Sequence, residues 1–196
     1  MRVGRGRAPL SLQKGLKKGL KIGLKIGLKK STHRTSKAHS GARQQSQGGA
    51  IDIAWVGVKA FLPDRAVRHA VEVARAHGKR LDLAASIVFV TDRALAKLHA
   101  VALGDPTRTD VITFDLSDDV GGPLVEIYVS AERARGVARR RHVRVERELS
   151  LYVVHGVLHV CGFDDSRPAD RARMRRAEAT VLKHLGFAPD LAPHDE

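Results

Sequence analysis

The sequence predicts an α+β fold in which a small mixed β-sheet is covered by helices. Segments with the residue pattern of strands occupy only the first part of the region that begins at residue 51, and helical segments lie between the earliest of them. The chain then continues as helix alone to its C-terminal region. One of these late helices is strongly apolar, which is typical of a helix at the centre of a fold.

Four segments have the pattern of strands. IDIAWV, which begins at Ile51, alternates as a half-buried strand does, whereas LAASIVFVT is rich in apolar and β-branched residues. TDVITFD and LVEIYVS follow on either side of a Gly-Gly-Pro turn. The expected strands span residues 51–56, 83–91, 109–115 and 124–130.

Five helices complete the expected fold, placed over about 64–78, 92–104, 130–141, 145–161 and 168–185. Asp92 and Ser130 are of the residue types that cap helix N-termini. Gly78 and Gly162 follow helical segments at the position where glycine commonly ends a helix. We expect the helices to lie on one side of the sheet.

The positive charge of the chain is concentrated in its first fifty residues. These hold 13 Lys and Arg and no acidic residue, whereas residues 51–196 hold 22 basic and 21 acidic residues. Residues 14–29 repeat KGLK or IGLK, and the glycines oppose a stable helix. We expect residues 1–49 to form a basic low-complexity tail. This tail is either disordered, or translated from a mis-assigned upstream start codon, or a targeting peptide. One domain at 50–190 and a short tail at 191–196 follow.

Cysteine content and hydropathy limit the cellular setting. Cys161 is the only cysteine, so an intramolecular disulfide and a cysteine-based zinc finger are both excluded. The sequence has no apolar run of about 18 residues and no secretory h-region. We therefore expect a cytoplasmic protein with no membrane partner and no dinucleotide cofactor.

The apolar helix carries a pattern of metal ligands, HGVLHVCGFDD. His155 and His159 are four residues apart, which places both imidazoles on one helical face. Gly162 can adopt a left-handed conformation that directs Asp165 back as a third ligand. Three protein ligands leave a fourth position free, as in catalytic zinc sites. We predict one Zn²⁺ per chain, held by His155, His159 and Asp165.

A run of arginines precedes the metal-ligand pattern. Such a run is usually a solvated face, but it can also form a rim that contacts RNA phosphates. We take Arg139, Arg140 and Arg144 as the candidate RNA contacts. Aromatic residues are few, at 4% of the chain, so backbone charge and shape would dominate recognition.

Several segments together resemble the YbeY family of bacterial metal-dependent endoribonucleases and ribosomal-RNA maturation factors. HGVLHVCGFDD matches the family signature HGxLHLxGyDH, and TDVITF matches TDVLSF. LVEIYVSAERA matches the following strand-to-helix segment, and Met174 and Glu178 match a downstream Met-x-x-x-Glu. The resemblance covers nearly all of residues 51–190. It implies an α+β fold with zinc in a cleft beside a basic face.

The resemblance implies a zinc-dependent, single-strand-specific endoribonuclease in ribosomal-RNA maturation and ribosome quality control, with ribosomal RNA and the small ribosomal subunit as partners. The attacking nucleophile stays open between a water on the metal ion and the substrate's 2′-OH. Asp165 stands where the family usually has a third His, and zinc accepts either ligand. Leu103 stands at the position of a cleft Arg, so phosphate contact is lost or moved, for example to Arg108.

Two rival functions remain at this point. The first is a non-catalytic ribosome-assembly factor that uses the metal only to hold its fold, and Leu103 is the reason to keep it. The second is a metallohydrolase of another class, such as a peptidase. Gly156 disfavours a peptidase because it occupies the position of the general-base Glu in HExxH enzymes.

Overall fold

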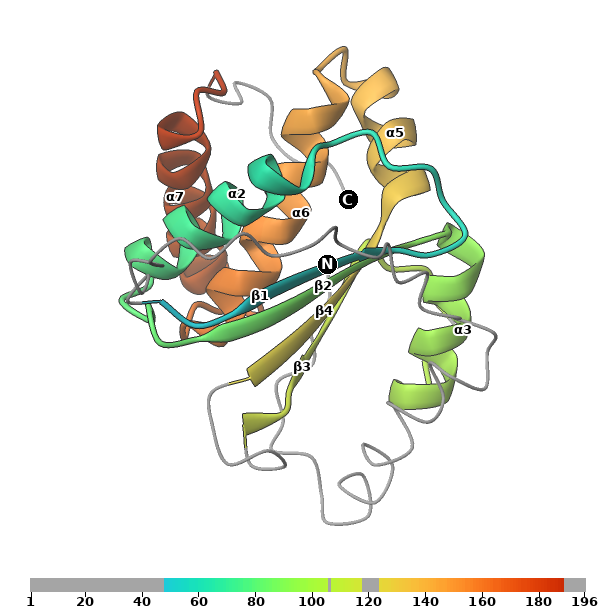
Figure 1. Cartoon of the computed structure of the whole chain (residues 1–196), viewed down its shortest axis with the longest axis horizontal. Helices are drawn as coiled ribbons and strands as arrows, with labels where there is room; N and C mark the ends of the chain where they lie inside the picture. Colours follow the sequence, from blue (N-terminus) through green and yellow to red (C-terminus); the bar gives the residue numbers. More distant parts are fainter. Residues whose placement is uncertain (1–47, 106, 118–123, 189–196) are drawn as a thin grey trace, which may run out of the picture.

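A four-stranded mixed sheet forms the centre of the computed structural model, which describes residues 48–105, 107–117 and 124–188 (Figure 1). The strand order is β1-β2-β4-β3. β1 pairs with β2 and β2 with β4 in parallel, whereas β3 runs antiparallel to β4, from Val111 opposite Val129 to Asp115 opposite Val125. The strands are β1 (Ile51–Trp55), β2 (Ala84–Val90), β3 (Val111–Asp115) and β4 (Leu124–Ser130).

Within the described residues five helices pack around this sheet, so the predicted α+β class is confirmed. They are α2 (Asp64–His77), α3 (Asp92–Leu103), α5 (Ala131–Arg140), α6 (Val145–Val160) and α7 (Pro168–His184). In Figure 1, α2, α5, α6 and α7 lie on one side of the sheet and α3 lies on the other. The expectation that all helices share one side was therefore wrong.

The two faces of the sheet carry separate hydrophobic cores, which explains the position of α3. The larger core joins the sheet to α2, α5, α6 and α7, with residues such as Val67, Ile127 and Val181. The smaller core packs Leu95 and Leu98 of α3 against Ile112 of β3 and other strand residues. Because the strands present apolar side chains on both faces, helices are needed on both sides to exclude water.

α6 lies at the centre of the larger core, and every residue from Arg147 to His159 is buried. Gly156 allows this helix to lie directly on the sheet. A Cβ at Gly156 would lie 2.8 Å from Ile127 Cγ2 and 3.2 Å from Thr113 Oγ1. Contacts of this length leave no room for a side chain. The absence of a side chain at this position therefore sets the distance between α6 and the sheet.

Side-chain caps fix the starts of two helices. Ser130 caps α5 as predicted, since its hydroxyl accepts a hydrogen bond from the Arg133 backbone N–H at 3.1 Å. For α3 the cap is Thr91, whose Oγ1 accepts from the Ala94 N–H at 3.1 Å, and Asp92 is the first helical residue. Both are good capping residues, so neighbouring candidates could not be separated by residue type alone.

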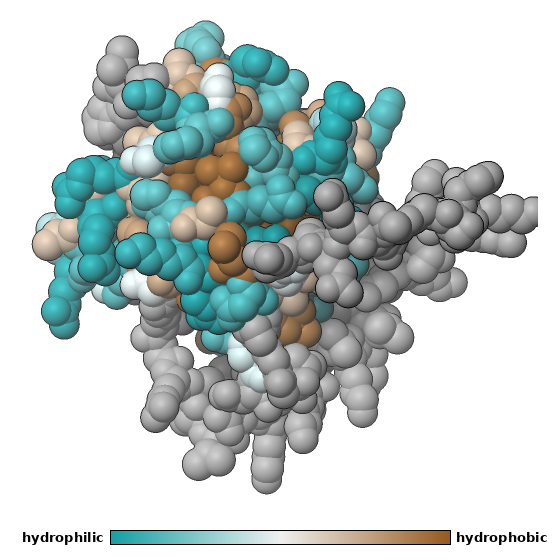
Figure 2. Space-filling view, turned by 60° about the vertical axis from the view of Figure 1, so that its left-hand side comes forward, coloured by the Kyte–Doolittle hydropathy of each residue, from teal (hydrophilic) through white to brown (hydrophobic). Residues whose placement is uncertain are grey.

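The surface on the side of α2 and α7 is largely hydrophilic, with apolar side chains exposed in a small area between polar ones (Figure 2). Among the described helices none is long and apolar enough to cross a membrane. Most of the expected N-terminal tail (1–47) and the whole expected C-terminal tail (191–196) lie outside the described residues. Gly48 and Gly49 belong to the described part.

Candidate metal centre

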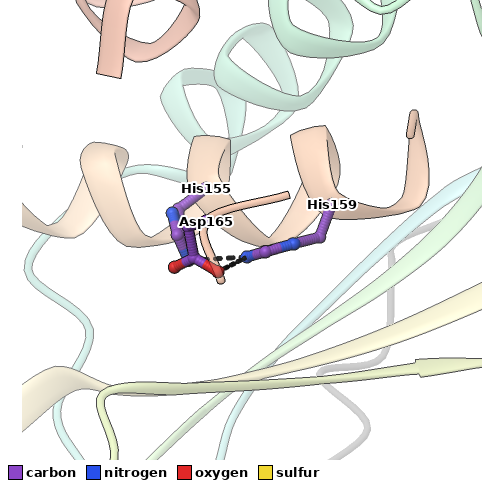
Figure 3. A group of neighbouring side chains, drawn as sticks. All are labelled: His155, His159 and Asp165. Atoms are coloured by element: carbon purple, nitrogen blue, oxygen red, sulfur yellow. Dashed lines mark hydrogen bonds and ion pairs between the residues drawn. The ribbon is translucent and has the colours of Figure 1, made fainter. Parts of the chain in front are cut away.

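The structure brings the three predicted metal ligands together. His155 and His159 project from one face of α6, and Asp165 approaches them from the segment after the helix (Figure 3). The two Nε2 atoms lie 2.9 Å apart, and the Asp165 oxygens lie 3.8 Å from His155 Nε2 and 3.7 Å from His159 Nε2. All three side chains are buried. Their ligand atoms lie within 4.8 Å of one another, a separation that one metal ion can bridge.

The outer nitrogen of each imidazole has a partner that fixes the tautomer. His155 Nδ1 lies 2.6 Å from Glu178 Oε1, and His159 Nδ1 lies 3.1 Å from the Phe163 carbonyl oxygen. A carbonyl accepts and cannot donate, so His159 Nδ1 carries the proton. With Nδ1–H donating in both rings, the two Nε2 atoms face each other beside a carboxylate. A proton on one Nε2 can bridge the pair, and a divalent metal ion in its place could bind both nitrogens.

Local backbone geometry directs Asp165 to the site. α6 ends at Val160, and Gly162 follows with φ +101°, a conformation that favours glycine. The Asp164 carboxylate accepts hydrogen bonds from the Asp165 N–H at 2.8 Å and the Ser166 N–H at 3.2 Å. Asp164 therefore shapes the turn, while its neighbour Asp165 directs its carboxylate towards His155 and His159.

Burial and charge act on the ligands in a way that fits a cation site. Burial lowers the pKa of His155, but the hydrogen bond and charge of Glu178 and the charges of Asp110 and Asp165 outweigh it, so the pKa is raised. Burial raises the pKa of Asp165, and the nearby His155 opposes that change. Both groups therefore hold a proton more readily in the metal-free fold than in an unfolded chain.

Two carboxylates near the ligands received no role in the sequence reading. Glu178 on α7 is 7% exposed and holds the His155 ring, and Asp110 is 8% exposed and adds negative charge near it. Glu178 had entered only as part of the Met-x-x-x-Glu match. The spacing of His155 and Glu178 along the chain does not show that they meet, because the contact depends on how α7 packs against α6.

Among the described residues, the other predicted site residues make no contact with the three candidate ligands. Arg108 is paired with Asp92 at 3.5 Å at the start of α3, and no contact within the described part of the chain joins it to the ligands. Arg139 and Arg140 lie at the C-terminal end of α5, and Arg144 precedes α6 and pairs with Glu146 at 3.5 Å. All four are exposed.

Comparison with known proteins assigns the family. The family model described as endoribonuclease YbeY matches residues 57–186, about two thirds of the chain. The chain belongs to the YbeY family. Its candidate metal-ligand segment lies within the matched region, as do the described helices and strands other than β1.

Individual relatives agree with this assignment. The endoribonuclease YbeY of Anaeromyxobacter sp. (strain Fw109-5) is 39% identical over 110 residues, which cover 55% of this chain and 57% of that protein. The protein of the same name from Flavobacterium psychrophilum is 41% identical over 49% of this chain and 68% of its own length. The one from Gluconobacter oxydans is 38% identical over 63% and 74%. The match thus spans little more than half of the first of these YbeY proteins.

Solved structures are also similar to this chain, at a lower level of identity. The solution structure of TM1509 from Thermotoga maritima covers 69% of this chain and 88% of its own, with 24% identity and a TM-score of 0.49. The fold class rests on the strands and helices of this chain.

Proposed function

We propose that this YbeY-family chain is a zinc-dependent endoribonuclease that cleaves single-stranded RNA. The single observation that carries the proposal is the pair of buried imidazoles whose Nε2 atoms face each other at 2.9 Å beside Asp165. Imidazole nitrogens and a carboxylate oxygen suit zinc. The relatives' name, endoribonuclease YbeY, supports RNA as the substrate.

The chain's own residues divide the work of such a site. His155, His159 and Asp165 would hold the ion, and Glu178 keeps the His155 ring in the tautomer that presents Nε2. When bound, the ion supplies Lewis-acid stabilisation of charge on a phosphoryl oxygen. Arg139, Arg140 and Arg144 are the proposed contacts to RNA phosphates, and Arg108 is a further candidate because 76% of its side chain is exposed beside Asp92.

The biological setting completes the proposal. The family resemblance favours ribosomal RNA as substrate, the small ribosomal subunit as partner, and a cytoplasmic role in ribosomal-RNA maturation and ribosome quality control. The first fifty residues hold 13 Lys and Arg and no acidic residue, and a run of arginines lies between Arg133 and Arg147; both features support a polyanionic partner.

A non-catalytic, metal-stabilised assembly factor is the second candidate, and Leu103 is the observation that favours it. This residue ends α3 with 43% of its surface exposed, and it offers no hydrogen bond to a phosphate. A peptidase is not favoured, because the position of the general-base Glu is Gly156, which packs against Ile127 and Thr113 and faces the sheet.

One assay on the purified full chain separates the two candidates. Single-stranded ribosomal RNA fragments are incubated with the zinc-loaded protein, with protein treated with a chelator, and with the His159→Ala variant. The exposed His184→Ala variant is the matched control. We expect cleavage by the wild type and the control alone, while circular dichroism shows that the chelated protein stays folded. Folded, zinc-loaded protein that leaves RNA intact would support the assembly factor. Products that end in 2′,3′-cyclic phosphate would identify the 2′-OH as the nucleophile.

A further inference from the structure

A hollow of about 570 Å³ lies where α5 ends and α6 begins. Its lining consists of Arg135, Ala138, Arg139, His142, Val143 and Val145. Val145 precedes the ligand His155 by ten residues, which is about 15 Å along the axis of α6. The hollow is therefore separate from the metal centre, although both are built on the same helix.

The charges around this hollow are unbalanced. Arg141 and Arg147 lie 3.7 Å and 3.9 Å from the Glu148 carboxylate, and Arg144 pairs with Glu146. By contrast, the side chains of Arg139 and His142 have no partner among the residues that the structure describes, and no carboxylate is part of the lining. An anion in the hollow would complete these contacts.

Arg135 is held in place at the edge of the hollow. Its guanidinium carbon lies 4.1 Å from the centre of the Phe61 ring, and its Nη2 donates to the Lys59 carbonyl at 3.3 Å. These contacts use the face of the guanidinium and one of its donors, so further N–H groups remain for a ligand.

The backbone conformation of His142 points to a role for its side chain. α5 ends in a Schellman motif, in which the Val143 N–H donates to Ala138 O at 3.0 Å and the His142 N–H to Arg139 O at 3.4 Å. His142 has φ 54°, a left-handed conformation in which glycine is the usual residue. A histidine here is locally unfavourable, and it places an imidazole at the rim of the hollow.

The floor of the hollow is apolar. Ala138 is 2% exposed, and Val143 and Val145 are half-buried beside it. A free inorganic anion would gain nothing from such a floor. A nucleotide would, because its phosphate suits the cationic rim and the flat face of its base can cover the valines.

We infer that this hollow binds one nucleotide of the single-stranded RNA substrate, with a phosphate at Arg139 and His142 and a base or ribose over Val143 and Val145. This inference rests on the proposed function, since it takes RNA as the substrate. The hollow would hold the strand at a second point, ten residues or about 15 Å along α6 from His155, and so orient the strand along this helix.

Binding measurements on the full zinc-loaded chain test this site. Fluorescence anisotropy follows a labelled, 2′-O-methylated single-stranded oligoribonucleotide over a range of salt concentrations, and a gel checks that the oligonucleotide stays intact. The test variants are Arg139→Ala and His142→Gly. The matched controls are Arg175→Ala, an exposed arginine on α7, and Lys79→Gly, the other non-glycine residue with positive φ among those described.

Both test variants are expected to weaken binding at least about tenfold, since each removes a charge-assisted hydrogen bond. Arg139→Ala should also reduce the slope of log K against log salt by about 0.7. His142→Gly should keep or raise the melting temperature, as Lys79→Gly should, because glycine suits both backbone positions. A loss of affinity in a variant that is no less stable cannot be ascribed to unfolding.

Two results would overturn the inference: test variants that bind like the controls, or displacement of the RNA by polyglutamate as effectively as by polyuridylate. Cleavage of unmodified RNA is measured in parallel, so the two proposals can fail separately. If the hollow variants lose RNA binding but the wild type cleaves no RNA, the RNA site stands and the endoribonuclease proposal is overturned. If both hollow variants bind and cleave RNA like the wild type, the endoribonuclease proposal stands and the RNA site is overturned.

Discussion

Glu178 on α7 and His155 on α6 are joined by a 2.6 Å contact between Oε1 and Nδ1, and both side chains are buried. This contact links the packing of two helices to the orientation of a metal ligand. A carboxylate behind a ligating imidazole fixes the ring and raises its basicity. α7 therefore orients a candidate metal ligand without contributing one itself.

Replacement of Glu178 by Gln is expected to lower zinc affinity by about 10- to 100-fold, the usual effect of losing such a partner. Competition with a chromophoric chelator measures the affinity. Asp170→Asn, on the same helix but paired with Arg173 at 3.8 Å, is the control and should bind zinc like the wild type. Equal affinity in both variants would show that Glu178 only packs.

The ligand role of Asp165 can be tested against its neighbour. Asp165→His should retain one zinc per chain, since imidazole can replace the carboxylate, and Asp165→Ala should lose most of the metal. Asp164→Ala should retain it, because the Asp164 carboxylate contacts the Asp165 and Ser166 N–H groups of the turn. Metal analysis of purified protein gives the stoichiometry. Loss of zinc in Asp164→Ala alone would reverse the assignment.

Two glycine-to-alanine variants should change stability in opposite directions. Gly156→Ala forces a methyl group to within 2.8 Å of Ile127 Cγ2, and we expect a loss of about 1–3 kcal/mol of unfolding free energy. At Gly136 in α5 the nearest atom is Arg140 Nη1 at 3.6 Å, so alanine should stabilise the protein by about 0.5–1 kcal/mol. Urea unfolding measures both. In an Ile127→Ala background, Gly156→Ala should lower the free energy of unfolding by less, because the clashing methyl group is gone. A double-mutant cycle measures this coupling between the two positions.

Protons and metal should compete for the same site. The pKa values of His155 and Asp165 are raised above 6.5 and 3.8 in the metal-free fold. Because a raised pKa means that the folded chain holds the proton more tightly than the unfolded chain does, these two groups increase the free energy of unfolding at low pH. The contribution of His155 is lost as the pH rises above 6.5 and His155 releases its proton. Metal-free protein should therefore lose melting temperature over this range relative to a His155→Gln/Asp165→Asn variant. With zinc the stabilisation should instead grow with pH, because the ligands bind metal in their deprotonated forms.

Two truncations test where the folded domain begins. The Gly49 N–H donates to Leu81 O at 2.9 Å, and the buried Arg75 side chain donates to Gly49 O at 2.7 Å. Removal of residues 1–49 should therefore cost about 1–3 kcal/mol, because Arg75 loses a buried acceptor. Removal of residues 1–45 should leave the melting temperature unchanged and weaken salt-sensitive RNA binding, since it removes 13 cationic side chains. Equal melting temperatures for both truncations would contradict this boundary.

Elements that depend on local sequence could be predicted, and so could the convergence of the three candidate ligands. The strand expected at 124–130 coincides with β4, and the helix expected from Val145 begins there. The His155 and His159 pair follows from the helical repeat, and the turn at Gly162 accounts for Asp165. Each of these predictions needed only the periodicity or the conformational preference of nearby residues.

Features that depend on packing between distant segments could not be predicted. The position of α3 on the second face of the sheet follows from apolar residues on both faces of β4 and β2, which a list of strands does not assign to a side. The contact between Glu178 and His155 depends on the packing of α7 against α6. Gly156 was read as a missing catalytic Glu, whereas its structural role is the close approach of α6 to Ile127.

The three candidate metal ligands lie within one stretch of 11 residues, most of which is a single helix. Starting a helix is unfavourable because several residues must be fixed before the first hydrogen bond forms. A metal ion that bridges His155 and His159 in the unfolded chain fixes the turn between them, so zinc present at the start of refolding should speed the formation of α6. Because zinc then also binds the unfolded chain, it raises the free energy of unfolding by less than its affinity for the native protein alone implies. For this protein, zinc is expected to act as a template during folding as well as a ligand of the finished fold.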